Sequence, residues 1–113
     1  MNLSLRSPGA ALRAAAVTTS PTLSVEQATL FVTDLDGRAA ELERLLAESL
    51  LRLQVLARHQ RVVSMMEQPL LGRQCHVRVT PCLVLDTGLR LVTIPGDLQQ
   101  LNLARLETAL SRP

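Results

Sequence analysis

Aromatic residues and lysine are almost absent from this chain of 113 residues: it has no Trp, no Tyr and no Lys, and its one aromatic side chain is Phe31. Proteins that bind single-stranded nucleic acid stack bases on aromatic side chains, so this class is disfavoured. The twelve basic residues are all Arg and lie scattered along the chain, and ten acidic residues leave a net charge of +2. Nucleic-acid binding usually shows as a clustered basic patch, so we expect a solvated surface and no nucleic-acid partner.

Cysteine is also scarce, and long apolar runs are lacking. Cys75 and Cys82 are spaced neither as a Cys-x-x-Cys redox pair nor as a zinc site. His59 and His76 lie far apart, and neither has an acidic residue at the spacing of a metal site or a catalytic triad. No apolar run approaches the roughly 18 residues of a membrane span. We therefore expect a cytoplasmic protein without catalytic residues, metal, cofactor or membrane contact.

The first 24 residues differ in composition from the rest of the chain. They carry Arg6 and Arg13 and no acidic residue, and they end near a structure-breaking Thr18-Thr19-Ser20-Pro21 segment. Arg13 interrupts the apolar stretch that a secretory signal needs. An organelle transit peptide fits this composition and stays open, while a flexible tail is the simpler interpretation. We expect residues 1–24 to be a flexible N-terminal tail and residues 25–113 to be the folded domain.

Hydrophobic periodicity divides the domain into strands and helices. Short β-rich apolar runs predict strands, whereas leucines at three- and four-residue spacing predict helices. We expect strands at 28–33, 60–66, 81–85 and 89–94, and helices at 37–57, at 70–76 and from 96 onward. The long first crossover makes the first two strands parallel. An Asp86-Thr87-Gly88 turn joins the last two strands as an antiparallel hairpin.

The first predicted helix has one apolar face and one charged face. Its N-cap candidate is Asp36, and Glu48 and Arg52 are spaced to pair at i,i+4. His59 would lie near its C-terminus, where a cation complements the helix dipole. The apolar face is the stripe Leu42, Leu45, Leu46, Leu50, Leu53 and Leu56.

A Thr80-Pro81 step precedes the apolar run 82–85. Pro cannot donate a hydrogen bond to a sheet, so it belongs at the entry of a strand. In thioredoxin-like folds the Pro at this place is cis, a geometry open almost only to X-Pro bonds. Together with the order β-α-β-α-β-β-α, this step predicts an α/β, three-layer, thioredoxin-like fold.

Redox chemistry in that fold needs a low-pKa thiolate at the N-terminus of the first helix. Here that place holds Asp34-Leu35-Asp36-Gly37, which has no sulfur. We expect Cys82 to pack in the core as a small hydrophobe and Cys75 to be partly exposed on the short helix. A redox enzyme that uses Cys75 or Cys82 stays open as an alternative, as does an adaptor in some other assembly.

Several short motifs, in a constant order and spacing, resemble the KaiB family, the small circadian-clock proteins of cyanobacteria and other bacteria. They are equally similar to the KaiB-like N-terminal domain of the clock sensor kinase SasA. The similarity runs without gaps over about residues 30–110. It rests on Leu30-Phe31-Val32, Arg61-Val62-Val63, Gln68-Pro69-Leu70-Leu71, Thr80-Pro81-Cys82-Leu83 and Gly96-Asp97-Leu98.

The resemblance implies a protein-interaction module with no catalytic activity. KaiB docks on the ATPase ring of KaiC from a thioredoxin-like state, which it reaches by switching from a different, tetrameric fold, and it then recruits further clock proteins. The SasA domain holds the thioredoxin-like state permanently and competes for the same KaiC surface. Docking in the family uses the end of the second strand and the short helix after Asn-Pro.

Carried over to this chain, the family's docking residues fall at Met66, His76 and Val77. The implied partner is a KaiC-type hexameric ATPase or another clock protein, and an assembly of identical chains is left open. Arg61 would be a basic contact on the side used for further partners, and Pro81 would be the structural cis-proline.

Three departures from the family pattern predict a chain that stays thioredoxin-like. The family's Gly-Leu-Asp in the last helix is Glu107-Thr108-Ala109 here, and replacing a helix-disfavouring Gly by Glu stabilises helix by up to about 1 kcal/mol. A hairpin turn at 86–88 replaces a proline-rich segment. His76 stands where the family has Lys. We therefore expect a divergent member that keeps one fold.

Overall fold

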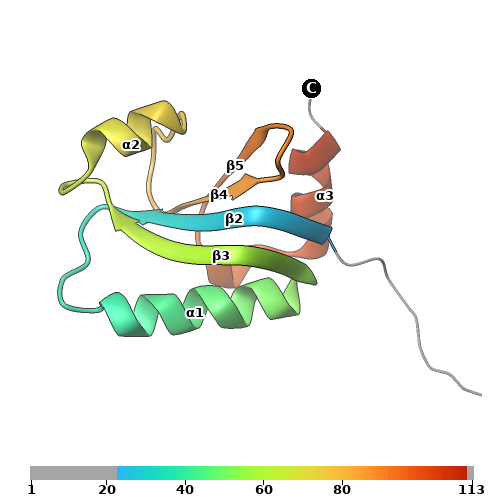
Figure 1. Cartoon of the computed structure of the whole chain (residues 1–113). Helices are drawn as coiled ribbons and strands as arrows, with labels where there is room; N and C mark the ends of the chain where they lie inside the picture. Colours follow the sequence, from blue (N-terminus) through green and yellow to red (C-terminus); the bar gives the residue numbers. More distant parts are fainter. Residues whose placement is uncertain (1–22, 112–113) are drawn as a thin grey trace, which may run out of the picture.

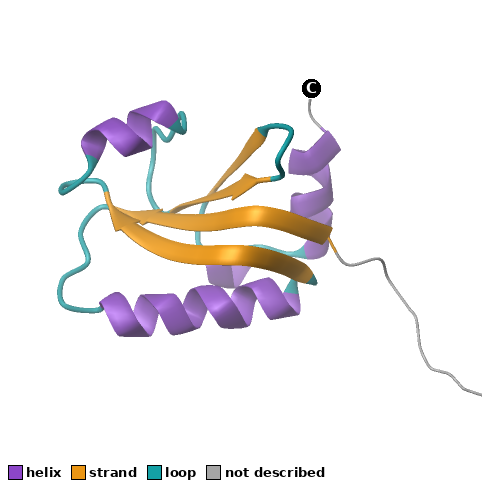
Figure 2. Cartoon of the chain, in the orientation of Figure 1, coloured by secondary structure: helices purple, strands orange, loops and turns teal. Residues whose placement is uncertain are grey.

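A four-stranded sheet forms the centre of the computed structural model, which describes residues 23–111 (Figures 1 and 2). Residues 1–22 of the predicted tail, which was expected to cover residues 1–24, lie outside the described residues. The first strand begins at Leu23. The elements are β2 (Leu23–Val32), α1 (Ala39–Arg52), β3 (Val55–Ser64), α2 (Pro69–Gln74), β4 (Cys82–Asp86), β5 (Leu91–Pro95), the 3₁₀ helix η1 (Leu98–Gln100) and α3 (Leu103–Ser111).

The sheet is mixed, with the strand order β3-β2-β4-β5. β2 and β3 are parallel and are joined through α1, whereas β4 is antiparallel to both β2 and β5. The Thr80–Pro81 bond that leads into β4 is cis. The predicted order β-α-β-α-β-β-α is confirmed, and the chain has the thioredoxin-like topology that the sequence indicates.

Each face of the sheet carries its own apolar cluster. On one face α1, η1 and α3 pack against the sheet through Leu46, Leu50, Leu98 and Leu106. α2 and the loop after it lie on the other face of the sheet (Figure 1). They cover a smaller cluster in which Phe31 is fully buried. The smaller cluster consists of Phe31, Val63, Cys75, Val77, Cys82 and Val84, with Met65 and Leu71 against it.

The first helix ends earlier than its leucine pattern predicts. Gln54 takes a left-handed conformation with φ +60°, its N–H donates to the Leu51 carbonyl, and β3 starts at Val55. The side chain of Val55 is then buried and that of Leu56 is 62% exposed. The prediction that Leu56 extends the helix was wrong, because the run Leu-Arg-Leu-Gln-Val-Leu satisfies both a helical and a strand period.

The first strand is also longer than predicted, since it starts at Leu23 and not at residue 28. Leu23 pairs with Val55 and Val25 with Ala57, so the start of β3 gives this segment a partner that its own sequence does not reveal. The polar pair Glu26-Gln27 interrupts the apolar pattern, so the sequence pattern alone does not predict that the strand extends back to Leu23.

Three expectations for the charged face of α1 are also wrong. The helix begins after Arg38, and Asp36 lies in a left-handed turn with φ +52° instead of capping it. Arg52 does not pair with Glu48 but donates to the carbonyl oxygens of Leu98 and Leu101, at 2.8 and 2.7 Å. His59 is an exposed residue in the middle of β3, and α1 ends seven residues before it at Arg52.

The C-terminal half of the domain follows its turn and cap signals. In the hairpin the Gly88 N–H donates to Asp86 Oδ1 at 2.9 Å, and Gly88 has φ +90°. Asp97 Oδ1 accepts from Gln99 N at the start of η1. A break at Leu101 then separates η1 from α3, so the predicted single helix from residue 96 is divided in two.

Within residues 23–111, no helix is both long enough and apolar enough to cross a bilayer.

Candidate protein-docking surface

The segment from residue 65 to residue 80, which we call the α2 segment, leaves the sheet at the end of β3 and returns at β4. The Met65 N–H donates to the Val32 carbonyl, which extends the β2–β3 pairing by one step. Ser64, only 1% exposed, fixes the turn because its hydroxyl donates to the Thr33 carbonyl and accepts from Glu67 N. Pro69 opens α2 at the first helical position, where its missing N–H costs nothing.

The end of α2 is closed by a Schellman motif with His76 in the left-handed position. The His76 N–H donates to the Arg73 carbonyl at 3.1 Å and the Val77 N–H donates to the Gly72 carbonyl at 2.9 Å. His76 has φ +61° and is exposed. Val77 follows it into the core, where it is 8% exposed.

Three large apolar side chains of the α2 segment face solvent. Met66 is 69% exposed, Leu70 is 65% exposed and Val79 is 58% exposed. Leu71, the neighbour of Leu70, packs against the smaller cluster instead. We call Met66, Leu70 and Val79, together with the exposed His76, the docking surface. Two exposed cations, Arg73 and Arg78, belong to the same segment.

The five residues singled out from the sequence do not lie together. Met66 and His76 are both exposed on the α2 segment, as a contact surface requires. Val77 is buried in the cluster beneath α2, so its side chain is held by the core. Pro81 lies past the segment at the entry of β4, and its carbonyl accepts from Gly96 N at 2.9 Å. Arg61 lies on β3, and its Nε donates to the buried Thr29 hydroxyl at 3.0 Å.

The sequence analysis did not assign Leu70 or Val79 to the site. Leu70 lies in the matched Gln68-Pro69-Leu70-Leu71 motif, and the helical period alone requires that one of the two adjacent leucines face outward. Val79 gave no such signal, because an apolar residue just before a Thr-Pro step is indistinguishable from the start of a buried strand.

Both thiols lie in the smaller cluster, where the chemistry of a nucleophile is disfavoured. Cys75 is only 8% exposed, which corrects the expectation of partial exposure, and Cys82 is 2% exposed as expected. Burial raises the pKa of the Cys75 thiol, an effect that the Arg61 guanidinium opposes. Burial likewise raises the pKa of Cys82. Both thiols are thus held in the protonated form, which is the weaker nucleophile and metal ligand.

Metal ligation finds no support among residues 23–111, where His, Cys, Asp and Glu side chains do not gather in groups of three or more. The α2 segment offers instead three exposed apolar side chains, one on the short helix and one on either side of it in the chain, and two exposed cations. Such a surface suits contact with another protein. Comparison with known family models, with curated proteins and with solved structures gives no match to this chain.

Proposed function

We propose that this chain is a KaiB-like, non-catalytic protein-interaction module that docks through the α2 segment on a KaiC-type hexameric ATPase. The observation that carries the proposal is the exposure of Met66, Leu70 and Val79 on one short segment. Large exposed apolar side chains that gather on one part of a surface are typical of interaction sites. The thioredoxin-like topology and the ordered motifs that resemble the family support it.

The charges of the segment indicate what the partner surface should carry. Arg73 and Arg78 are exposed on the same segment as the apolar side chains, while Glu67 is the one acidic residue between 65 and 80. A complementary partner would present an apolar groove with acidic residues at its rim, because opposite charges around an interface steer association. The Arg61 guanidinium donates to the Thr29 hydroxyl of β2. In this proposal Arg61 contacts a second partner protein, next to the one bound at the docking surface.

The proposed module keeps a single fold. In α3, which holds Glu107, the Arg105 N–H donates to Asn102 Oδ1 at 2.9 Å at the start of the helix, and Leu106 is buried against the core. The hairpin turn at 86–88 is closed by Asp86 and by Thr87. An NMR spectrum with two sets of slowly exchanging resonances would contradict this part of the proposal.

The decisive experiment is gel filtration of the full chain mixed with a KaiC-type hexamer, with and without ATP. We expect co-migration, and we expect Leu70→Glu to abolish it. Glu is favourable in the first turn of a helix, so this variant should keep its fold. Leu89→Glu is the matched control, because Leu89 is 96% exposed on the hairpin outside the docking surface. A chain that fails to bind under both conditions, or equal binding by the two variants, would contradict the proposal.

A further inference from the structure

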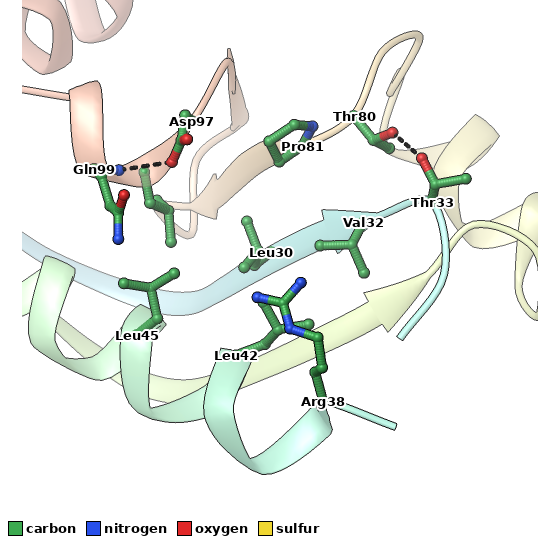
Figure 3. A pocket seen from close by; sticks show the side chains of 11 residues that line it. Leu30, Val32, Thr33, Arg38, Leu42, Leu45, Thr80, Pro81, Asp97 and Gln99 are labelled. Carbon is green, nitrogen blue, oxygen red and sulfur yellow. Dashed lines mark hydrogen bonds between the residues drawn. The ribbon is translucent and has the colours of Figure 1, made fainter. Parts of the chain in front are cut away.

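A cavity of about 320 Å³ opens on the side of the molecule where β2 ends, between the start of α1, the cis-proline loop and η1 (Figure 3). Its floor is aliphatic and belongs to the core. Leu30, Leu42 and Leu98 are each at most 6% exposed, and Leu45 and Val32 complete the floor. The volume lies within the range of pockets that take small molecules. The cavity shares none of its lining residues with the docking surface.

One cation faces this aliphatic floor. Arg38 precedes α1, and its Nε lies 3.3 Å from Glu41 Oε1. Its guanidinium lies over Leu42 and points toward Leu30, into the cavity (Figure 3). Among residues 23–111, no acceptor is within hydrogen-bond distance of either Nη atom. The flat, two-pronged end of the guanidinium is therefore free to bind a planar anion.

The opposite rim carries groups that are already engaged. Asp97 Oδ1 accepts from Gln99 N at 3.0 Å, and the hydroxyl groups of Thr33 and Thr80 are hydrogen-bonded to each other at 2.5 Å. In Figure 3 Asp97 lies across the cavity from Arg38. Its negative charge would repel an anion from that end. The Glu41 carboxylate occupies the Nε side of Arg38, so an anionic ligand is directed to the Nη end of the guanidinium, with its apolar part over the leucines.

We propose that this cavity binds a small aliphatic carboxylate. The carboxylate accepts two parallel hydrogen bonds from the Nη atoms of Arg38, the geometry in which Arg and carboxylate pair best. The alkyl chain covers Leu30, Leu42 and Leu98 and removes apolar surface from water. The proposal does not depend on the proposed docking function, because it uses a different surface and different residues.

Hexanoate is the probe, titrated into the full-length chain with carbon-13-labelled leucine and valine methyl groups. We expect progressive shifts of the methyl signals of Leu30, Leu42, Leu45 and Leu98, and none at Leu70 or Val79. Hexanol and hexylamine have the same chain length without the negative charge. Both should bind at least about tenfold more weakly than hexanoate, because a charge-assisted pair contributes roughly 1.5 kcal/mol.

Variants at Arg38 test the role assigned to its guanidinium. Arg38→Met keeps an unbranched stem and should raise the Kd for hexanoate about tenfold, while Arg38→Lys, which keeps the charge and loses the fork, should fall between. Arg44→Met is the control, because Arg44 is an exposed residue of α1 that does not line the cavity. Gln99→Trp places a large ring at the rim and should block binding.

Several results would overturn the proposal. Equal affinity for hexanoate and hexanol would show that Arg38 does not select the ligand, and equal loss in the Arg38 and Arg44 variants would point to general electrostatics. Shifts confined to Leu70 and Val79 would place binding on the docking surface, and no shift at any methyl group would remove the site. Each result is independent of co-migration with a KaiC-type ring, so failure of one proposal leaves the other untouched.

Discussion

Met65 lies directly against Gly72, its side chain covering the position where any other residue would carry a β-carbon. A β-carbon built on Gly72 would fall 2.2 Å from the Met65 sulfur and 2.5 Å from its terminal methyl carbon. Met65, the first residue of the α2 segment, and Gly72, the fourth residue of α2, are thus fitted to each other. This contact sets how closely α2 can approach the smaller cluster, and with it the placement of the docking surface.

Gly72→Ala and Met65→Ala should therefore be strongly coupled. In the native chain Gly72→Ala gains about 1 kcal/mol of helix propensity but must displace the flexible end of Met65, at a cost of about 1–3 kcal/mol. In a Met65→Ala background the displacement disappears and only the gain remains. Urea unfolding of the four chains should give a coupling free energy of about 1 kcal/mol or more. Additive effects would mean that Met65 moves aside without cost.

His76 shows a similar relation between backbone and side chain. Its φ of +61° places an L-residue in the left-handed region, which Gly adopts without penalty. His76→Gly should raise the free energy of unfolding by about 1 kcal/mol, provided that the Schellman hydrogen bonds stay in place. His76→Ala is the control, since it removes the imidazole and keeps the β-carbon, and it should not stabilise. If His76 also contacts a partner, both variants should weaken docking on the hexamer, although only one of them gains stability.

Much of the fold could be predicted because local signals and tertiary structure agree there. The Thr80–Pro81 step, the turn at 86–88 and the leucines from Leu42 to Leu50 each specify one conformation, and the structure contains all three. The errors occur where one sequence fits two structures. The run around Leu53 to Leu56 suits a helix or a strand, and pairing between Leu23 and Val55, far apart in sequence, decides the outcome.

Only part of the candidate site could be predicted from the sequence. Met66 and His76 could be named because the resemblance to the KaiB family places docking residues at these positions, and both side chains are exposed in the structure. The burial of Val77 follows from the Schellman motif, which brings the second residue after the helix back onto it. Cys75 is buried by the same closure. Neither the motif nor the cavity beside Arg38 has a local sequence signal, because both depend on how separate elements meet.

Arg52 has one partner in the sequence-based prediction and different partners in the structure, and substitutions can distinguish the two. The sequence places it opposite Glu48, whereas its guanidinium binds the carbonyl oxygens of Leu98 and Leu101 and so ties α1 to η1. Arg52→Met should lower the free energy of unfolding by about 1–2 kcal/mol, because two charge-assisted hydrogen bonds are lost and two carbonyl groups lose their donor. Glu48→Gln should change stability by less than about 0.5 kcal/mol, as an exposed substitution does. If the two substitutions lower the free energy of unfolding equally in chemical denaturation, the result would favour the predicted Glu48–Arg52 ion pair.

The two buried thiols should control stability in alkaline solution. Burial raises the pKa of Cys75 and of Cys82 above the ordinary value of 9.0. Between that value and the folded pKa, the unfolded chain has lost protons that the folded chain still binds, so the free energy of unfolding falls as pH rises. The contribution is complete below about pH 9 and is lost progressively above it. Because the sequence has no Lys and no Tyr, it has no other side chains whose ordinary pKa lies between about 9 and 11.

Urea unfolding under reducing conditions, at intervals across this pH range, measures the effect directly. The native chain should lose stability steadily above about pH 9, whereas a chain with Cys75→Ala and Cys82→Ala should give an almost constant free energy of unfolding. The comparison uses the slope with pH, so the packing lost in the double variant does not enter. The single variants divide the slope between the two sites, and Cys82, the less exposed thiol, should account for the larger share. A slope that persists in the double variant would show that groups outside the smaller cluster cause it.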